Sequence, residues 1–312
     1  MTKPLIQTPD CAYSQLTVSG ALSLGASLYV PATRPDLGDI LHRVKFPALK
    51  SVIVCLEDAI YERDIPKALN NLAEALDAEL PSGLLRFVRP RHGRLLRQVL
   101  RLNNIGTIDG FVLPKIDEVN IPHYAEIAGR YPELWLMPTL ETDIAFAPGR
   151  LTTLCERLHE ADNPVLCVRT GGNDLLRLLG LHRPRTATLY ETPLRSVLER
   201  LITVFKPAGF EMAAPVLGHI DSPDLLAREV RTDVDYGFAS KAALSPAQVP
   251  VIERAYRVDQ RDYESAQTLL DPTAPAVFKL HGQMLEVAVH RDWARRILAR
   301  AELFGLIEEH TA

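Results

Sequence analysis

The sequence predicts an α/β protein, a (β/α)8 TIM barrel with a C-terminal helical arm. Three observations lead to this prediction: eight short apolar segments recur along the chain, a longer amphipathic segment follows each of them, and polar residues gather where the apolar segments end. The apolar segments lack strict polar alternation, which is typical of parallel strands that are buried on both faces. A chain of 312 residues also suits a single barrel domain.

The eight apolar segments are expected to be the strands of the barrel, because most of them are too short to form helices. Their repeated alternation with amphipathic segments favours a closed barrel over an open sheet. The expected strands are Ala26–Val30, Ser51–Glu57, Leu84–Arg89, Gly110–Lys115, Leu134–Glu141, Pro164–Gly171, Glu211–Gly218 and Gly237–Ala243.

Proline and serine mark the starts of three expected helices. Pro66 stands in the first turn of one helix, and Pro223 follows Ser222 at the start of another. Ser245 is expected to cap the helix after the eighth strand, with Pro246 at its first position. These signals place helices after strands two, seven and eight.

The pattern changes beyond the eighth strand and its helix. Asp262–Leu270 and Val289–Phe304 are expected to be helices, joined by the proline-broken segment Asp271–Pro275. The apolar face of the last helix must be buried, either against a neighbouring subunit or, as the alternative, against its own barrel. We therefore expect a barrel domain over residues 20–258 and a lid and oligomerisation arm over residues 259–312.

Composition and charge exclude several classes of function. The formal net charge is −4 and the pI is about 6.2, so no basic field exists for nucleic acid or an anionic membrane. No apolar run reaches the roughly 18 residues that span a bilayer, and Met1–Asp10 lacks the apolar core of a signal peptide. The cysteines show no metal-site spacing. We therefore expect a cytoplasmic enzyme with a small-molecule substrate.

Polar residues follow the expected strands at the end where barrel enzymes carry their functional side chains. Acidic and basic residues together ring this expected mouth, which is hard to obtain from helix caps alone. Carboxylates next to water suit a hard divalent cation such as Mg²⁺. The residues concerned are Glu57 and Asp58 at the end of strand two, Arg89 at the end of strand three, Lys115 at the end of strand four, Glu141 at the end of strand five, Asp174 beyond strand six and Lys241 on strand eight.

Glu141 and Asp174 are expected to hold this cation, Mg²⁺ or Mn²⁺, because they come from adjacent strands and can meet over one ion. Two alternatives stay open at this point. Glu141 pairs with an arginine at the mouth, or Asp174 caps the following helix, Leu175–Leu179.

Short motifs along the chain occur in the order known from one family. They are Leu28–Pro31, Cys55–Ala59, Val88–Arg89, Gly110–Lys115, Leu140–Thr142, Gly172–Leu175, Gly237–Lys241 and Ser245–Gln248. On these motifs the chain resembles the family of citrate lyase beta subunits and malyl-CoA lyases, which is related to the metal-dependent pyruvate aldolases. Gly282–Glu286 also resembles the lid segment of this family.

The resemblance implies a barrel that assembles as a homotrimer or hexamer. It implies cleavage of a hydroxy acid, or of its CoA thioester, to a keto acid. By the same resemblance, Glu141 and Asp174 bind Mg²⁺ and Arg89 polarises the substrate carbonyl. Glu57 and Asp58 are implied to hold metal-bound waters.

The chain departs from the family at four positions. Arg91 replaces an asparagine, Ser245 replaces a histidine, and Ala32 replaces a glycine. Glu286 replaces the aspartate that the lid of malyl-CoA lyases supplies to a neighbouring subunit, and it is the candidate general base, with a metal-bound water as the alternative. These changes leave the expected metal site intact.

We therefore expect a Mg²⁺-dependent carbon–carbon bond lyase that acts by a retro-aldol or retro-Claisen reaction. Arg89 and Lys241 at the mouth are expected to contact the substrate. Arg34, after strand one, is expected to bind a phosphate or carboxylate, with a solvated loop charge as the alternative. A Schiff-base aldolase that uses Lys115 or Lys241 is the alternative enzyme. A non-catalytic barrel subunit is the alternative without chemistry.

Overall fold

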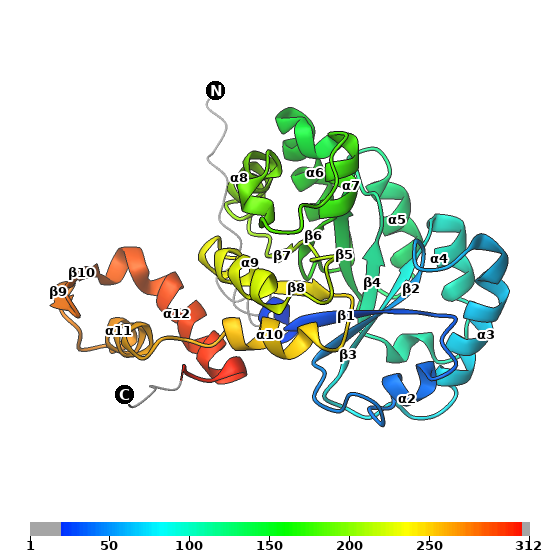
Figure 1. The fold of residues 1–312 in the computed structure, drawn as a ribbon, viewed down its shortest axis with the longest axis horizontal. Coiled ribbons are helices and arrows are strands. Elements are labelled where there is room, and N and C mark those ends of the chain that lie inside the picture. Colours follow the sequence, from blue (N-terminus) through cyan, green and yellow to red (C-terminus); the bar gives the residue numbers. More distant parts are fainter. Residues whose placement is uncertain (1–19, 308–312) are drawn as a thin grey trace.

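The computed structural model describes residues 20–307 and confirms the predicted fold. Eight parallel strands pair in sequence order, and β8 pairs with β1 to close the barrel (Figure 1). The strands are β1 Ala26–Pro31, β2 Ser51–Leu56, β3 Leu85–Pro90, β4 Gly110–Leu113, β5 Trp135–Leu140, β6 Val168–Thr170, β7 Met212–Ala214 and β8 Ser240–Ala243.

Each observed strand lies within or close to its expected segment, but β6 and β7 are shorter than expected. Strand β7 ends at Ala214, directly before Pro215. Proline carries no N–H group for the ladder, so regular pairing stops there. The backbone that follows these short strands is free to form the loops at the barrel mouth.

Helices follow the strands and form the outer layer of the barrel (Figure 1). Pro66 stands in the first turn of α3 and Pro223 begins α9, as predicted. The helices of this layer are α2 Leu37–Leu41, α3 Ile65–Leu76, α4 Gly93–Val99, α5 Ile121–Ala128, α6 Pro148–His159, α7 Gly172–Leu178, α8 Leu194–Phe205, α9 Pro223–Asp235 and α10 Gln248–Ala255.

The prediction that Ser245 caps the eighth helix is wrong. Helix α10 begins at Gln248, and its N-cap position is Ala247. The Ser245 hydroxyl accepts a hydrogen bond from the Ala247 N–H at 3.3 Å, while Oε1 of Gln248 accepts one from the Leu244 N–H at 2.8 Å. A turn satisfied by these two side chains therefore separates the strand from the helix.

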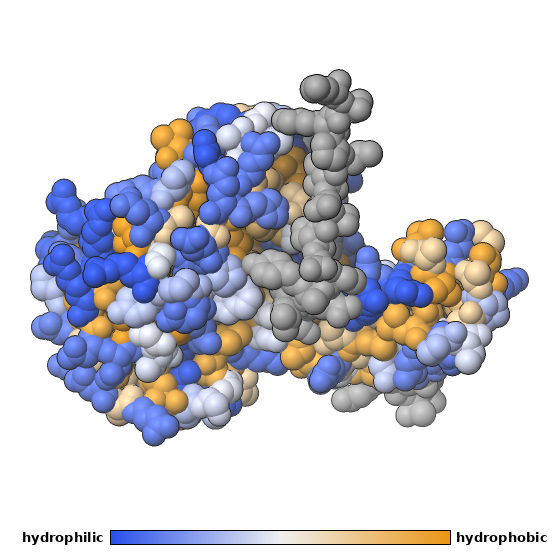
Figure 2. All heavy atoms as spheres, turned by 180° about the vertical axis from the view of Figure 1, so that it is seen from behind, coloured by the Kyte–Doolittle hydropathy of each residue, from blue (hydrophilic) through white to orange (hydrophobic). Residues whose placement is uncertain are grey.

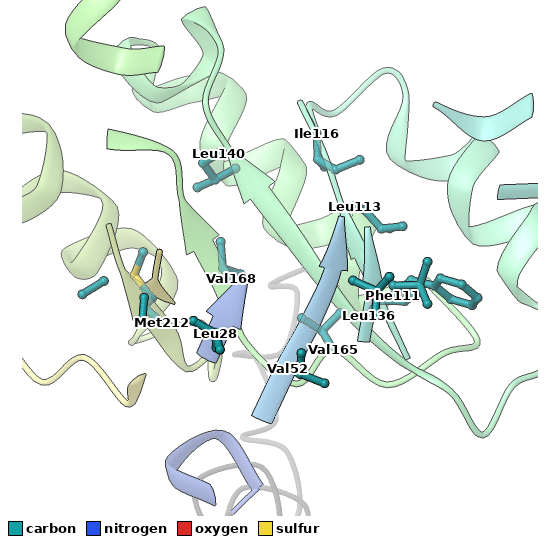
Figure 3. Close-up of a cluster of buried hydrophobic side chains, with 14 of the residues drawn as sticks. Leu28, Val52, Phe111, Leu113, Ile116, Leu136, Leu140, Val165, Val168 and Met212 are labelled. Carbon is teal, nitrogen blue, oxygen red and sulfur yellow. The ribbon is translucent and has the colours of Figure 1, made fainter. Parts of the chain in front are cut away.

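Apolar side chains fill both the space under the helices and the inside of the barrel. Leu28, Val52 and Leu136 belong to the cluster between strands and helices (Figure 3). A second cluster inside the barrel includes Ile53 and Phe87. Because the lower interior is packed with apolar groups, the barrel is a core and not a pore, and polar chemistry is confined to one end.

The C-terminal arm contains the two expected helices and a hairpin that the sequence did not predict. The helices are α11 Gln260–Leu270 and α12 Val287–Phe304. Between them, β9 Val277–Leu280 pairs antiparallel with β10 Gln283–Glu286. His281 and Gly282 both have positive φ angles, 48° and 84°, which suits the tight turn of such a hairpin.

One end of the arm is anchored on the barrel while the hairpin projects away from it (Figure 1). Phe304 packs against Tyr256 with ring centroids 5.3 Å apart, and Arg296 forms a 2.7 Å ion pair with Glu211. The expected domain division at residue 258 stays a prediction, and residues 308–312 lie outside the described part of the chain.

Two further expectations concern the whole chain. Of residues 20–307, no helix has the length and apolar character required to cross a bilayer. Cys55, Cys155 and Cys167 are buried free thiols. Cys11 and the segment Met1–Asp10 lie outside the described residues.

Candidate active site

The C-terminal ends of the strands surround a cavity of about 210 Å³, which we call the mouth cavity. It collects most of the polar residues that the sequence placed at strand ends, so the expected mouth exists. Its lining includes Tyr29, Cys55, Glu57, Asp58, Ala59, Arg89, Thr139, Glu141, Arg169, Thr170, Gly171, Gly172, Asn173, Asp174, Ala214, Val216, Ala242 and Leu244.

Arg89 is held between two buried carboxylates at this mouth. Its Nη2 atom donates to Oε1 of Glu141 at 2.9 Å and lies 2.8 Å from Oε2 of Glu57. Its Nη1 atom donates to the hydroxyl of Tyr29 at 3.2 Å. Only 8% of Arg89, 1% of Glu57 and 2% of Glu141 are exposed, so the three charges form one desolvated group.

Burial and charge act in opposite directions on this group. Burial alone lowers the pKa of Arg89, but Tyr29, Glu141 and Glu57 outweigh it, and the net pKa lies well above the usual range. Burial raises the pKa of Glu141, and the Arg89 charge opposes that rise. Arg89 is therefore a permanent positive charge in a low-dielectric site.

Two backbone features place Glu141 beside this arginine. Gly171 lacks a side chain, and a Cβ atom there would lie 2.4 Å from Cβ of Glu141 and 2.6 Å from its Oε2. Lys115, with a positive φ of 53°, donates its backbone N–H to Oε1 of Glu141 at 2.9 Å. A glycine on one side and a backbone donor on the other thus fix the carboxylate.

Lys115 also ties the second strand to this group. Its ammonium forms a short ion pair with Glu57 and lies 3.6 Å from Oδ2 of Asp58. Burial lowers the pKa of Lys115, but Glu57 and Asp58 outweigh this effect and the net pKa is raised. Asp58 itself is largely exposed at the rim of the mouth cavity.

Asp174 stands in the first turn of α7 and lines the mouth cavity. The alternative that it caps this helix is wrong, because α7 begins at Gly172 and Gly171 occupies the N-cap position. Arg177 is its recorded ion-pair partner, at 3.5 Å. The charge of Asp174 contributes to the raised pKa of Glu141, so the two carboxylates interact.

Carboxylate oxygens dominate the donor set that a cation would meet here. No group of three or more histidine, cysteine, aspartate or glutamate side chains within residues 20–307 is arranged as a metal cluster. A cation at the mouth would therefore rely on Glu141 and Asp174, with water or substrate as further ligands. Mg²⁺ commonly binds in this manner, through one or two carboxylates.

The expectation that Lys241 contacts the substrate is wrong. Lys241 is fully buried, and its side chain contacts Glu229 and Asp233 of α9. Its ammonium donates to the carbonyl of Pro215 at 2.7 Å, to Glu229 at 2.9 Å and to Asp233 at 2.8 Å. The residue belongs to a buried ionic network and does not line the mouth cavity.

The lysines also fail the requirement of the alternative Schiff-base aldolase. A lysine that attacks a carbonyl needs a depressed pKa. Burial lowers the pKa of Lys241, but the charges of Asp233 and Glu229 outweigh burial, and the net pKa is raised. The pKa of Lys115 is raised in the same way by Glu57 and Asp58. Neither lysine is therefore prepared as a nucleophile.

Two other candidate residues lie away from the mouth cavity of their own chain. Arg34 forms a two-pronged contact with Asp36, at 2.8 and 2.7 Å, in the loop after β1. Glu286 ends β10 in the arm. Neither residue lines the cavity, so their contacts with substrate stay predictions.

The mouth residues that the sequence analysis missed include Tyr29, Thr139 and Arg169. These three stand inside apolar segments, where we considered only the polar residues at the ends. Arg169 precedes Gly171 by two residues, so strand alternation would have placed it on the inner face. Arg91, by contrast, has a structural role, because its Nη2 atom donates to the backbone carbonyls of Glu57 and Ile60 and so holds the loop after β2.

An eight-stranded barrel with charged residues at the C-terminal ends of its strands is the architecture of a TIM-barrel enzyme. The family described as C–C bond lyase of the TIM-barrel fold matches residues 19–306, and the chain belongs to this family of carbon–carbon bond lyases. Membership of this family favours an enzyme over the alternative of a non-catalytic barrel subunit.

Individual relatives confirm the resemblance to citrate lyase beta subunits. A citrate lyase subunit beta-like protein of Mycobacterium tuberculosis is 26% identical over 280 residues, which are 84% of this chain and 90% of that protein. The citrate lyase subunit beta of Escherichia coli K12 is 24% identical over 302 residues, 90% of this chain and 94% of that protein. A structure of CitE from M. tuberculosis with magnesium, acetoacetate and coenzyme A superposes with a TM-score of 0.67 at 23% identity, and the match covers 90% of this chain and 99% of that chain.

Proposed function

We propose that this chain is a Mg²⁺-dependent lyase that cleaves a hydroxy acid, or its CoA thioester, to a keto acid. The observation that carries the proposal is the buried contact of Arg89 with Glu141, next to Asp174 at the mouth. It combines a fixed positive charge with carboxylates suited to a hard cation.

The residues present fit a divalent cation. Glu141 and Asp174 offer oxygen ligands, and their mutual repulsion contributes to the raised pKa of Glu141. A cation between them would relieve this repulsion. Mg²⁺, or Mn²⁺ in its place, favours such oxygen ligands and keeps several waters. The magnesium in the M. tuberculosis CitE complex supports this assignment.

Glu57 and Asp58 are proposed to hold the waters around the cation. Both residues follow β2 and line the mouth cavity. In the closed barrel, β2 lies across from β5 and β6, which are followed by Glu141 and Asp174. Oε2 of Glu57 is buried without a well-directed hydrogen bond, although it lies 2.8 Å from Nη2 of Arg89. A water that donates to this oxygen would complete its coordination.

The proposed reaction breaks one carbon–carbon bond. The substrate hydroxyl loses its proton and becomes the carbonyl of the keto acid, and the bonding electrons leave with the other fragment as an enolate. Bound Mg²⁺ would supply charge that favours loss of the hydroxyl proton. Arg89 would stabilise the oxygen on which the enolate charge develops, and its Nε atom is buried without an acceptor.

The size of the mouth cavity limits what it encloses. A cavity of about 210 Å³ suits a small acid, so the nucleotide part of a CoA thioester would extend outside it. The CitE complex holds acetoacetate and coenzyme A together, which supports a thioester substrate. Arg34, at the loop after β1, is our candidate contact for an outer phosphate or carboxylate of that substrate.

The arm is proposed to act on a neighbouring subunit in a homotrimer or hexamer. Apolar surface is visible on the arm in Figure 2. The exposed apolar residues of the arm include Val277, Met284 and Val289, of which 53%, 67% and 69% are accessible. No described residue beyond 258 lines the mouth cavity of its own chain. In the assembly, Gly282–Val287 would cover a neighbour's mouth, and Glu286 would serve there as the general base.

Isothermal titration of Mg²⁺ tests the metal assignment directly. The wild type is expected to bind one ion per chain, and both Glu141→Gln and Asp174→Asn are expected to lose at least about tenfold in affinity. Asp143→Asn is the matched control, because Asp143 follows Glu141 closely but pairs with Arg150 outside the cavity. Unchanged affinity in Glu141→Gln and Asp174→Asn would refute the site.

A further inference from the structure

Arg169, on β6, is a buried arginine of the mouth cavity that no carboxylate neutralises. It is 3% exposed and lines the cavity. Its guanidinium donates a hydrogen bond to the sulfur of Met137 at 3.8 Å, is also hydrogen-bonded to the Cys167 side chain, and lies 5.7 Å from the centroid of the Tyr29 ring. Among residues 20–307, no ion pair joins Arg169 to an acidic side chain.

Arg89 gives the contrast within the same cavity. Its guanidinium lies 5.8 Å from the same Tyr29 ring, but Glu141 and Glu57 balance its charge. A buried charge without a counterion is costly, because neither water nor an opposite charge compensates for its lost hydration. Thioether and aromatic contacts recover only a small part of this cost for Arg169.

A second polar residue, Thr139, lies beside Arg169, and its hydroxyl has no hydrogen-bond partner. Thr139 pairs with Arg169 in the register of β5 and β6, so the two side chains share the inner face of the barrel. Thr139 is buried and lines the cavity. Glu141 and Gly171 follow the two residues by two positions, so this pair lies one barrel layer below Glu141.

We propose that Arg169 and Thr139 form an anion subsite at the floor of the mouth cavity, which binds a second carboxylate of the substrate. The inference rests on the proposed function, in which another part of the substrate lies near Glu141 and Asp174. One guanidinium and one hydroxyl suit the two oxygens of a carboxylate. The preferred substrate is therefore a small hydroxy acid that carries a further ionised carboxylate. The acid itself is either free or the acyl part of a thioester formed through another carboxyl group.

Malate and lactate are suitable probes, because both are 2-hydroxy acids and malate has one additional carboxylate. Their affinities are measured by isothermal titration in the presence of Mg²⁺. The wild type is expected to bind malate at least about tenfold more tightly than lactate. Arg169→Met, which keeps an apolar stem, is expected to lower malate affinity about ten- to hundredfold and to leave lactate affinity unchanged.

Two further variants complete the design. Thr139→Val removes one hydroxyl and is expected to lower malate affinity several-fold, which keeps the test available if Arg169→Met does not fold. Arg195→Met is the matched control, because Arg195 lies on α8 and pairs with Glu199 outside the cavity. It is expected to bind both acids as the wild type does.

The outcomes separate the subsite from the proposed function. Unchanged malate affinity in folded Arg169→Met, an equal loss for both acids, or a wild type that binds malate no better than lactate would overturn the subsite. Failure of the proposed function would instead appear as binding of both acids that needs no Mg²⁺ and persists in Glu141→Gln. A malate preference carried by Arg169 would survive that result.

Discussion

Nη2 of Arg89 lies 2.9 Å from Oε1 of Glu141, and both side chains are desolvated at the end of the barrel where the strands terminate. The same guanidinium nitrogen lies 2.8 Å from Oε2 of Glu57, so one arginine on β3 joins the carboxylates that follow β2 and β5. These contacts fix the positions of the Arg89 guanidinium and of the Glu57 and Glu141 carboxylates relative to one another. Arg89 is thereby held in place at the mouth by Glu141, Glu57 and Tyr29.

Replacing Arg89 by lysine should reduce activity without unfolding the protein. A lysine ammonium is a point charge that cannot reach Glu141, Glu57 and Tyr29 with a planar fork. We expect Arg89→Lys to lower turnover by at least about a hundredfold. Steady-state kinetics with a urea unfolding curve measures both properties. Arg94→Lys, an exposed arginine of α4, serves as control, and near-normal turnover in Arg89→Lys would make Arg89 a structural residue.

Gly171 should tolerate no side chain because of Glu141. The new Cβ of Gly171→Ala would lie 2.6 Å from Oε2 of Glu141, so the carboxylate must shift. We expect a loss of about 1–3 kcal/mol in the free energy of unfolding and weaker Mg²⁺ binding by titration. Gly149→Ala is the control, since nothing lies within 4 Å of its Cβ position. Wild-type Mg²⁺ affinity in Gly171→Ala would contradict the crowding argument.

The buried network around Lys241 should stabilise the fold in a pH-dependent manner. Burial raises the pKa of Glu229, but Lys241 and Arg183 outweigh it and lower the pKa to about 2, from 4.5. A depressed folded-state pKa gives stability that is present above the unfolded pKa and is lost as pH falls toward the folded value. We expect Glu229→Gln to cost about 3 kcal/mol at pH 7.

Urea unfolding curves at several pH values check this expectation. The difference between wild type and Glu229→Gln should be constant above about pH 7, where the neighbouring Asp233, whose pKa is raised to about 6, is also ionised in the fold. It should shrink below about pH 5, as protonation of Glu229 in the unfolded chain sets in. Arg228→Gln, on the exposed face of the same helix, should show a small effect at every pH. A difference independent of pH down to the acid limit of the fold would contradict the assignment.

The arm should act across subunits if the proposed assembly is correct. Glu286→Ala and Glu141→Ala chains are each expected to be inactive, because one lacks the lid carboxylate and the other lacks the metal carboxylate. Mixed oligomers should recover part of the activity, since one mouth can then combine an intact Glu141 with a neighbour's intact Glu286. Verified subunit exchange without recovery would favour a lid that acts within its own chain, or a Glu286 without a catalytic part.

The strand ends of the barrel were predictable because their residues interrupt apolar segments. Glu57, Arg89, Glu141 and Asp174 each follow such a segment, and the closed barrel brings all four to one cavity. Barrel geometry thus converts a repeated pattern along the chain into a ring of side chains in space.

Residues inside short segments were not predictable in the same way. A shift of one residue along a strand reverses the face of every side chain, and the four-residue β8 places Ala242 in the cavity and Lys241 outside it. Arg169 stands in an otherwise apolar segment, so its charge was hidden by its neighbours. The hairpin of the arm was missed because its two strands have only four residues each.

Release of a keto acid is the measurement that tests the central claim most directly. The protein is incubated with hydroxy dicarboxylic acids and their CoA thioesters, and keto acid is detected as its dinitrophenylhydrazone. We expect product from at least one substrate, loss of product with EDTA, recovery with Mg²⁺, and a decrease of at least about a hundredfold in Glu141→Gln. Keto acid formation that continues in EDTA and at the wild-type rate in Glu141→Gln would contradict a metal-dependent lyase at this mouth.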